Sequence, residues 1–443
     1  MTKQQSLSFW QLFNLNFGFF GVQIAYALQS ANISRIFATL GADPHQLSFF
    51  WILPPLMGMI VQPLIGKWSD RTWCRIGRRK PYLLVGAIVA VAVMMLLPNA
   101  GSFNLGKAYL FLGLNAAMWF GLFSLIFLDT SINVAMQPFK MMVGDMVGEE
   151  QKAKAYSIQS FLCNAGSLVG YLFPIFFTWI GLANTAPEGV IPDSVIWSFY
   201  CGAAILILCV LFTFFKVKEM PPKEYAEFHG LDTTDAAGED NPGFIKLLKR
   251  APKTFWTVSL VQFFCWAAFL FLWTYTNGAI AETCWGTTDA ASPGYQAAGN
   301  WVGVLFAVEA VGAMLWAFAI PRFKTLRQAY MVSILIGAAG FLSVFFFHNQ
   351  YLLIISFLLI GIVWGAMLAI PFTFVTNALT DHIGTYLGLF NCAICLPQIV
   401  AAACGGLVLG LAGESQVNMF IAAAILLVCG AAATFLVKEH NQS

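Results

Sequence analysis

Asp129 is a single carboxylate near the middle of the long apolar segment 109–140. Ionisable groups at membrane depth are costly and usually functional. A carboxyl group that has left water favours its neutral, protonated form. Asp129 is therefore a candidate for binding a proton on one side of a membrane and releasing it on the other. Its oxygens can also accept hydrogen bonds from the hydroxyl groups of a bound solute.

Helical periodicity places Asn133 and Lys140 on the same face as Asp129. The alternative to a functional Asp129 is a fixed ion pair with Lys140. The two residues lie about 16 Å apart along a straight helix, so this pair needs a bend, for which Pro138 is the candidate. We expect Asp129 to carry the proton and, with Asn133, to bind the solute. Lys140 and Asp145 are expected to act in gating.

Glu309 is a second carboxylate inside an apolar run, in the sequence Ala307-Val-Glu-Ala-Val. Two interpretations stay open for it. Glu309 is either a second proton-coupling group or a group that forms a hydrogen bond between two helices.

The other polar residues considered for the site are uncharged. Taken singly, each suits a hydrogen bond between helices. Together they predict a cavity rich in neutral donors and acceptors, which suits a polyhydroxylated, uncharged solute better than an anion. The rings of Trp119, Trp266, Trp273 and Tyr275 offer stacking faces for a pyranose. The uncharged residues expected to bind the solute, beside Asn133, are Gln23, Gln29, Asn164, Asn391 and Gln398.

The elements that hold these residues are apolar runs of membrane-spanning length. The chain is 59% hydrophobic and 10% charged, whereas soluble domains carry about 25% charged residues. A span needs about 20 apolar residues. Suitable runs lie near 9–34, 47–66, 81–98, 109–140, 155–180, 195–215, 254–278, 299–320, 328–347, 351–376, 385–411 and 416–437. We expect an all-α membrane protein with twelve transmembrane helices in two six-helix bundles, 1–217 and 253–443, joined by a cytoplasmic linker, 218–252.

The distribution of Lys and Arg predicts the orientation, because cytoplasmic loops of membrane proteins are enriched in them. With both termini in the cytoplasm, every Lys and Arg except Arg35 and Lys107 lies at or near a cytoplasmic segment. Arg35 is expected near the outer mouth, where its side chain would reach the interface.

The loop after the second span has the pattern G-x-x-x-D-R, from Gly66 to Arg71, followed by G-R-R-x-P, from Gly77 to Pro81. A generic basic membrane anchor is one interpretation of it. The pattern resembles the signature loop of the major facilitator superfamily, and that resemblance implies a conformational latch. In such a latch Asp70 would pair with basic residues of the loop. The gating residues expected here are Asp70, Arg71, Arg78 and Arg79, with Lys140 and Asp145 beside them.

Further segments resemble the sucrose-type sugar/proton symporters of the glycoside–pentoside–hexuronide branch and its plant and animal relatives. These segments are Gly21–Gln29, Val61–Gly66, Leu128–Asp145 and Gly388–Gln398. The resemblance implies that the aspartate matching Asp129 carries the coupling proton and contacts the sugar.

Two departures from the plant proteins stand out. Lys140 occupies the place of an arginine, which loses a bidentate donor. The plant proteins also carry acidic residues on the seventh helix, where this chain has Leu272-Trp273-Thr274-Tyr275. Part of the coupling network of the plant proteins is therefore missing or replaced in this chain. Glu309 is the candidate for the replacement.

The expected function is proton-coupled symport of a disaccharide, maltose or sucrose, across a plasma membrane, here a bacterial inner membrane. The expected partners are the sugar, the proton and the lipid bilayer, with no nucleic acid, no metal and no cofactor, and the chain is expected to be a monomer. The alternatives are a sodium-coupled or other glycoside transporter and a sugar sensor that does not transport. A membrane enzyme is disfavoured because the five histidines do not cluster in a span, and an ATP-driven pump because the sequence has no G-x-x-x-x-G-K-[ST] loop.

Overall fold

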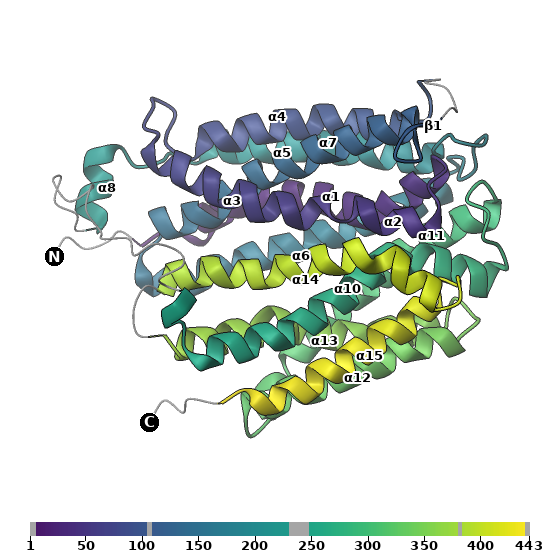
Figure 1. The fold of residues 1–443 in the computed structure, drawn as a ribbon. Helices are drawn as coiled ribbons and strands as arrows, with labels where there is room; N and C mark the ends of the chain where they lie inside the picture. Colours follow the sequence, from purple (N-terminus) through teal and green to yellow (C-terminus); the bar gives the residue numbers. More distant parts are fainter. Residues whose placement is uncertain (1–5, 104–108, 230–247, 380–382, 439–443) are drawn as a thin grey trace.

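The computed structural model describes the chain except residues 1–5, 104–108, 230–247, 380–382 and 439–443. Long helices run side by side along most of the molecule, and both chain ends lie at the same end of it (Figure 1). The elements up to the linker are α1 (Phe9–Thr39), α2 (Pro44–Phe50), α3 (Leu53–Arg71), α4 (Lys80–Leu96), η1 (Leu97–Asn99), β1 (Tyr109–Phe111), β2 (Leu114–Asn115), α5 (Ala116–Met146), α6 (Glu149–Trp179), α7 (Asp193–Lys216) and α8 (Pro222–His229).

The elements after the linker follow the same long-helix pattern. They are α10 (Lys253–Trp285), α11 (Pro293–Ala317), η2 (Ile320–Arg322), α12 (Leu326–Phe346), α13 (Leu353–Asn377), α14 (Ile383–Leu411), α15 (Asn418–Ala433) and η3 (Thr434–Leu436). Within the described residues, 11 helical segments are long and apolar enough to cross a membrane, and α2 and α3 together form one of them.

The first predicted span, α1, is long enough to cross a bilayer at 31 residues, but it falls outside that apolar set. Its polar residues explain this, because Asn16, Gln29, Asn32 and Arg35 are all buried on it. A helix that contacts other helices on most of its surface can carry such residues, since they face protein rather than lipid. Helix α1 packs against α5, α6, α7, α10 and α11.

The predicted start of the fourth span, at residue 109, is wrong. Residues Tyr109–Phe111 and Leu114–Asn115 form a short antiparallel hairpin, and the helix begins at Ala116. The tight turn has φ 52° at Leu112 and φ 71° at Gly113, a conformation that favours a two-residue hairpin. The side chain of Asn115 then accepts a hydrogen bond from the Met118 N–H, 2.8 Å, and caps the new helix.

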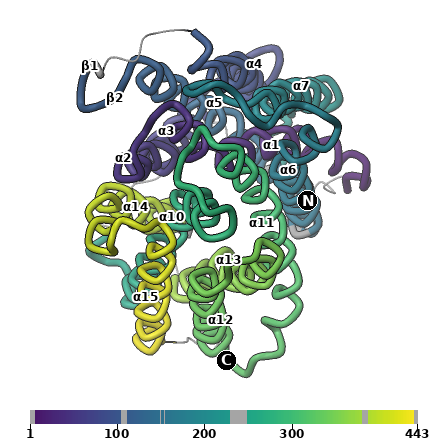
Figure 2. The backbone as a smooth tube through the Cα atoms, turned by 90° about the vertical axis from the view of Figure 1, so that its right-hand side faces the viewer, coloured from purple at the N-terminus to yellow at the C-terminus, as the bar shows by residue number. Residues whose placement is uncertain are grey.

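The helices before and after the linker form two groups, seen in Figure 2 as purple to teal above and green to yellow below. Within the first group α1 packs on α6 and α7, and α5 on α3 and α4. Within the second, α13 packs on α11 and α12, and α10 on α14 and α15. Between the groups α6 packs on α11, and α14 on α2 and α3. A Cβ at Gly303 of α11 would lie 2.0 Å from the Tyr171 carbonyl oxygen of α6, so this contact needs a glycine.

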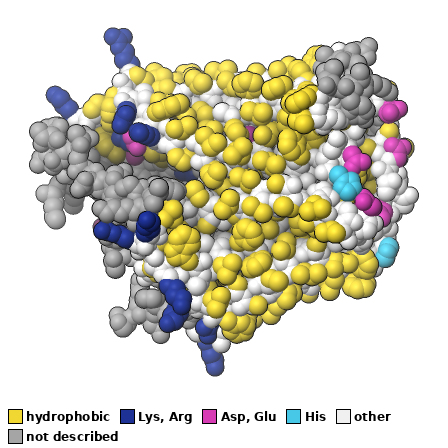
Figure 3. Space-filling view, in the orientation of Figure 1, with side chains coloured by type: hydrophobic (Ala, Val, Ile, Leu, Met, Phe, Trp, Pro, Cys, Tyr) yellow, Lys and Arg dark blue, Asp and Glu magenta, His cyan; other side chains and the backbone are white. Residues whose placement is uncertain are grey.

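The surface is a broad apolar belt between two charged ends (Figure 3). Lys and Arg gather at the end that holds the chain termini, called the basic end below, and Asp, Glu and His at the opposite, acidic end. An apolar belt of this kind suits a bilayer interior. The chain is therefore an all-helical membrane protein, apart from the one short hairpin in the described residues.

Glu219, just after α7, caps the N-terminus of α4. Its carboxylate accepts hydrogen bonds from the main-chain N–H groups of Arg78 (2.8 Å), Arg79 (3.0 and 3.1 Å) and Lys80 (2.7 Å). A Cβ at Gly77 would lie 2.5 Å from its Oε1, so this approach requires a glycine. An anion at a helix N-terminus is stabilising, and here it ties the start of the linker to the loop between α3 and α4.

Glu219→Gln is expected to destabilise the protein, because it removes the negative charge that satisfies the free N–H groups of α4. A hydrogen bond to a charged group contributes about 1.5–3 kcal/mol to stability. A loss of about 1 kcal/mol in the free energy of unfolding lowers the melting temperature of a domain of this size by about 2–4 °C. The measurement is thermal unfolding in detergent. Glu224→Gln is the matched control, since Glu224 is an exposed residue of α8 and should leave the melting temperature unchanged. Equal melting temperatures for the two variants would contradict the capping role.

Candidate transport site

Asp129 lies near the middle of α5 with a side chain that is 2% exposed. Its Oδ1 accepts a hydrogen bond from Nε2 of Gln29 on α1. Its Oδ2 is buried and has no hydrogen-bond partner in the described part of the chain. A buried polar atom normally has a partner. One oxygen is thus fixed by a neighbouring helix and the other is free to hold a proton or to accept a hydrogen bond from a ligand.

Asn133, one turn further along α5, extends this polar group toward α3. Its Nδ2 donates to the Asp129 carbonyl oxygen, 2.8 Å, and its Oδ1 accepts from Nε2 of Gln62, 2.7 Å. Gln62 was not among the predicted binding residues. Its position in the sequence could have indicated it, because Gln62 is a single amide between the apolar residues Ile60-Val61 and Pro63-Leu64.

Glu309 of α11 is 5% exposed and lies within electrostatic range of the Tyr171 hydroxyl on α6. That hydroxyl also lies near Ser30 on α1, whose Oγ donates to the Ala27 carbonyl oxygen, 3.2 Å. Ser30 directly follows Gln29, the partner of Asp129. The two buried carboxyl groups, one in each group of helices, therefore both lie in the neighbourhood of adjacent residues of α1.

Solvent reaches the middle of the molecule. Tyr26 of α1 is 38% exposed, although it lies within electrostatic range of Asp129, Cys163 and Cys395. Those groups belong to α5, α6 and α14, so the exposed ring faces a space between several helices. Lys140 is also exposed, and it lies near Cys163 and Cys395.

Lys140 forms no ion pair with Asp129 in the part of the chain that the structure describes. The fixed pair considered as the alternative to a functional Asp129 is therefore not formed in this conformation. No ion pair of Lys140 with Asp145 is seen there either, because Asp145 faces Arg78 and Arg79. A gating role of Lys140 stays a prediction.

The other predicted binding residues are dispersed around this space. Gln23 donates to Ser167 Oγ, 3.3 Å, and so joins α1 to α6. Asn164 is half-buried and donates to the Ser160 carbonyl oxygen of its own helix, 2.8 Å. On α14, Asn391 is half-buried with its Nδ2 3.9 Å from Cys395 Sγ, and Gln398 donates to the Ile394 carbonyl oxygen, 3.0 Å. Gln23, Asn164 and Asn391 are therefore half-buried, whereas Gln29, Asn133 and Gln398 are buried.

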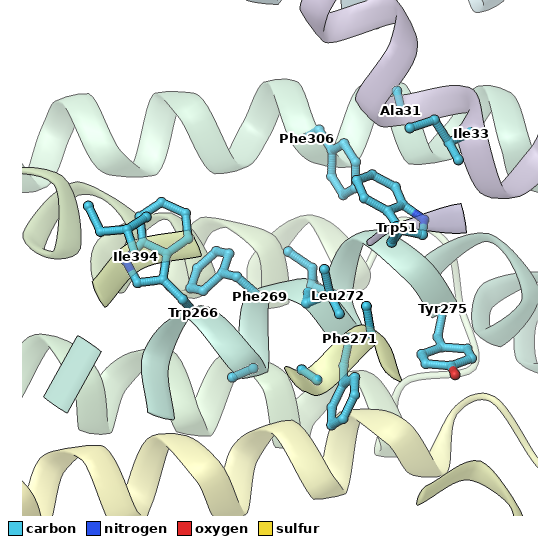
Figure 4. Packing of buried hydrophobic residues seen from close by; sticks show 14 of the residues in the cluster. Ala31, Ile33, Trp51, Trp266, Phe269, Phe271, Leu272, Tyr275, Phe306 and Ile394 are labelled. Carbon is cyan, nitrogen blue, oxygen red and sulfur yellow. The ribbon is translucent and has the colours of Figure 1, made fainter. Parts of the chain in front are cut away.

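Three tryptophans form an aromatic cluster in the second group of helices. Trp266 and Trp273 of α10 lie 6.2 Å apart between ring centroids, and Trp364 of α13 lies 5.5 and 5.8 Å from them. The Trp266 ring lies beside Ile394 of α14 (Figure 4), and its buried Nε1 has no acceptor in the described residues. Trp119 instead donates to the Phe111 carbonyl oxygen at the hairpin, 3.3 Å.

The ion pairs expected for the latch are formed at the basic end, and their gating role stays a prediction. Asp70 Oδ1 accepts from Nη2 of Arg78, 2.6 Å, and of Arg79, 2.7 Å, and Arg79 Nε donates to Asp145 Oδ2, 2.7 Å. Burial disfavours the charge of Arg79, but the hydrogen bonds and charges of Asp145 and Asp70 outweigh it and raise the pKa of Arg79. Arg71 is exposed and forms no ion pair in the described residues.

The latch also contacts the linker. The Arg78 guanidinium lies 4.5 Å from the ring centroid of Tyr225 on α8 and 5.1 Å from that of Trp73, within the range of a cation–π contact. The loop between α3 and α4, the end of α5 and the start of the linker are thus one interlocked unit of the first group of helices.

Arg35 does not reach toward an interface as expected, because its side chain is 1% exposed. Nε donates to Gln296 Oε1, 2.7 Å, Nη1 to Asn300 Oδ1, 2.9 Å, and Nη2 to Asn184 Oδ1, 2.7 Å. Three amide oxygens therefore replace water around the cation. Two of them belong to α11, so Arg35 joins the two groups of helices.

Further hydrogen bonds between the groups lie near Arg35. Gln296 donates to Thr39 Oγ1, 3.0 Å, and Asn300 to Thr178 Oγ1, 2.8 Å. These contacts involve the last residues of α1 and α6, which end at the acidic end. The acidic end is therefore closed, and solvent at Tyr26 must enter from elsewhere. In the described residues no group of three or more His, Cys, Asp or Glu could hold a metal ion.

The arrangement of helices matches solved transporters along almost the whole chain. A bacterial homologue of the human lysosomal transporter Spinster superposes with a TM-score of 0.67 at 17% identity, covering 97% of this chain and 96% of that one. A D-xylose-proton symporter superposes with a TM-score of 0.67 at 14% identity, covering 98% and 97%. At these identities the likeness concerns the fold alone.

The relatives found by sequence are more similar to this chain than the solved structures are. The sucrose transport protein SUT5 of Oryza sativa subsp. indica is 25% identical over 457 residues, covering 93% of this chain and 84% of that protein. The proton-associated sugar transporter A of Mus musculus is 28% identical over 165 residues, covering 37% of this chain and 22% of that protein.

The sequence profile of the Major Facilitator Superfamily matches residues 15–283, which is more than half of the chain. The match includes the Asp70–Arg79 latch and Asp129, and the family consists of transporters rather than enzymes. The chain therefore belongs to the Major Facilitator Superfamily.

Proposed function

We propose that the chain is a proton-coupled symporter of an uncharged disaccharide, maltose or sucrose. The observation that carries the proposal is the state of Asp129, a carboxyl group at membrane depth with one oxygen held by Gln29 and the other without a partner in the described residues. A buried carboxyl with a free oxygen can hold a proton, and when neutral it can accept a hydrogen bond from a sugar hydroxyl.

The surroundings of Asp129 support an uncharged, hydroxyl-rich solute. Near it lie the amides of Gln29, Asn133 and Gln62, which supply neutral donors and acceptors. In the second group of helices, the buried indole N–H of Trp266 is a donor without an acceptor in the described part of the chain. An anionic solute would need several convergent Arg or Lys, whereas the side chains that contact Asp129 and Asn133 in the described residues are the neutral amides of Gln29 and Gln62. The names of the rice and mouse relatives point to sugars as well.

The transport cycle follows from the cost of moving charge through the membrane. With the site open to the outer side, Asp129 takes up a proton and the sugar fills the space around Tyr26. Neutral Asp129 then lets the outer side close and the inner side open, because no bare charge has to be carried across. Each proton that moves inward gains ~2.3 kcal/mol per 100 mV of membrane potential.

The conformation described here fits the inward-facing state of that cycle. Arg35 and its amide partners close the acidic end, while Tyr26 remains accessible to solvent. We assign the basic end to the cytoplasm of a bacterial cell, because Lys and Arg gather there. In this proposal the monomer works by rocking two halves, 1–217 and 253–443, around the central site, with 218–252 as the linker.

Asp129→Asn tests the coupling role directly. Asparagine keeps the shape and hydrogen bonds of a permanently neutral carboxyl group, so the variant should still exchange labelled for unlabelled sugar but lose uphill accumulation driven by a proton gradient. The measurement is uptake of labelled maltose and sucrose into proteoliposomes with and without that gradient, and with a sodium gradient instead. Asp193→Asn, at an exposed carboxylate, is the matched control and should behave like the wild type.

Three outcomes of this experiment would count against the proposal. Full accumulation by Asp129→Asn would remove the coupling role of Asp129. Wild-type accumulation driven by sodium and not by protons would make the chain a sodium symporter. Binding of sugar without exchange in the wild type would make it a sensor.

Glu309→Gln decides between the two interpretations of Glu309. Glutamine keeps a hydrogen-bonding side chain of the same size, so a structural role would survive the change. If Glu309 shares the coupling through Tyr171, the variant should lose at least about tenfold in accumulation ratio at a pH difference of one unit, the equivalent of one proton or ~1.4 kcal/mol. We expect this loss, measured as the steady-state internal-to-external sugar ratio. A ratio equal to that of the wild type would assign Glu309 to helix packing.

A further inference from the structure

His45 uses both ring nitrogens to join the two groups of helices at the acidic end. It belongs to α2, and its Nδ1 lies 2.8 Å from the Gly406 carbonyl oxygen of α14. Its Nε2 lies 2.5 Å from Oε2 of Glu414 in the loop after α14. The side chains of His45 and Glu414 are 41% and 66% exposed. The contact is thus accessible to the solution at that end.

The hydrogen bonds fix the number of protons in this contact. A carbonyl oxygen only accepts, so Nδ1 must carry a hydrogen. A neutral imidazole then has no hydrogen on Nε2. The contact to Glu414 forms either when Nε2 is protonated or when the carboxyl group is protonated. In both cases the pair holds one proton more than a neutral histidine beside an ionised glutamate.

The backbone is built for this close approach. A Cβ at Gly406 would lie 2.6 Å from the His45 carbonyl oxygen, and a Cβ at Gly405 would lie 2.6 Å from Cβ of Ser48. Both distances are too short for a side chain. The glycine pair of α14 therefore lets α2 lie directly on it.

Glu414 is held in an uncommon backbone conformation. Its φ is +67°, directly after Gly413 with φ +84°. Residues other than glycine rarely adopt positive φ, and such strain is concentrated at functional sites. The Glu414 N–H donates to the Leu409 carbonyl oxygen, 3.1 Å, which fixes this conformation at the end of α14 and directs the carboxylate to His45.

The charges around His45 favour a proton. Within the described residues, the charged groups that face it are Glu414 from the loop after α14 and Asp43 from its own segment, where Asp43 Oδ1 accepts from the His45 N–H, 2.8 Å. Glu282 of α10 accepts from Ser415 Oγ, 2.7 Å, next to Glu414. All three are acidic. α14 faces the imidazole with the Gly406 carbonyl oxygen.

We propose that His45 and Glu414 form a second proton-binding site, separate from Asp129, that locks the acidic end closed. The proton comes from the solution at that end. When α2 moves away from α14, both contacts of the imidazole are lost and the proton is bound less tightly. By linkage, acidification favours the closed acidic end and alkaline pH favours its opening.

The test measures the acidic end itself and needs no sugar. Spin labels attached through non-natural amino acids at the exposed positions Ser102 and His348, one in each group of helices, report the separation of the two groups. The background carries Asp129→Asn and Glu309→Gln, so that the central carboxyl groups do not titrate. Distance distributions are recorded in nanodiscs between pH 5 and pH 8.

The ratio of closed to open molecules should rise about two- to fivefold from pH 8 to pH 5, the range for an exposed ion pair. His45→Gln and, independently, Glu414→Gln should each remove this pH dependence. Gly406→Ala should lower the closed fraction at every pH, because the new methyl group pushes α2 from α14. A closed-to-open ratio that does not change with pH, or a pH dependence that persists in both His45→Gln and Glu414→Gln, would overturn the proposal. Neither outcome depends on whether the chain transports maltose or sucrose.

Discussion

The bilayer interior offers no water, so a polar group placed there must find its partners within the protein. Asp129 meets this condition only in part, because Gln29 holds one oxygen and the other has no partner in the described residues. The rest of the structure can be understood from this constraint. α1 supplies Gln29 to Asp129 and further polar side chains to α6 and α11, and it can carry them because other helices cover it. The proposed role of Asp129 also requires that the free oxygen adjoin a space that a proton and a solute can enter.

The charged residues at the two ends of the molecule form different kinds of contact. At the basic end Asp70, Asp145 and two arginines form ion pairs within the first group of helices, and Glu219 and Tyr225 add the linker to them. At the acidic end the contacts cross between the groups, through Arg35 and its amides. In the proposed cycle, ion pairs within one half can stay formed, whereas contacts across the halves have to break. Neutral amides suit the second task, because releasing Arg35 from them costs less than separating it from a buried carboxylate.

The sequence predicted best those features that depend only on whether a residue lies in an apolar run or in a short loop. The depth of Asp129 and the partners of Asp70 could be predicted, because an apolar run and a short basic loop leave few alternatives. The partner of Asp129 could not, since the choice between Gln29 and Lys140 depends on how α1 is rotated against α5. Arg35 was placed wrongly for a related reason: a position near the end of a span suggests an exposed arginine, but Gln296 and Asn300 are distant in sequence and meet it only in the fold. The hairpin before α5 was missed because Tyr109–Asn115 is as apolar as the helix it precedes. Glu219 resembled any other linker residue, and only the folded chain shows its carboxylate on the N-terminus of α4.

In the proposed mechanism, sugar and proton move together and Asp129 couples them. The most direct measurement is the pH of a weakly buffered medium around proteoliposomes when a pulse of maltose or sucrose is added without any imposed gradient. We expect the medium to become alkaline as sugar enters with protons, and Asp129→Asn vesicles to exchange sugar without a pH change. Sugar entry into wild-type vesicles without alkalinisation, or an equal pH change with Asp129→Asn, would contradict this mechanism.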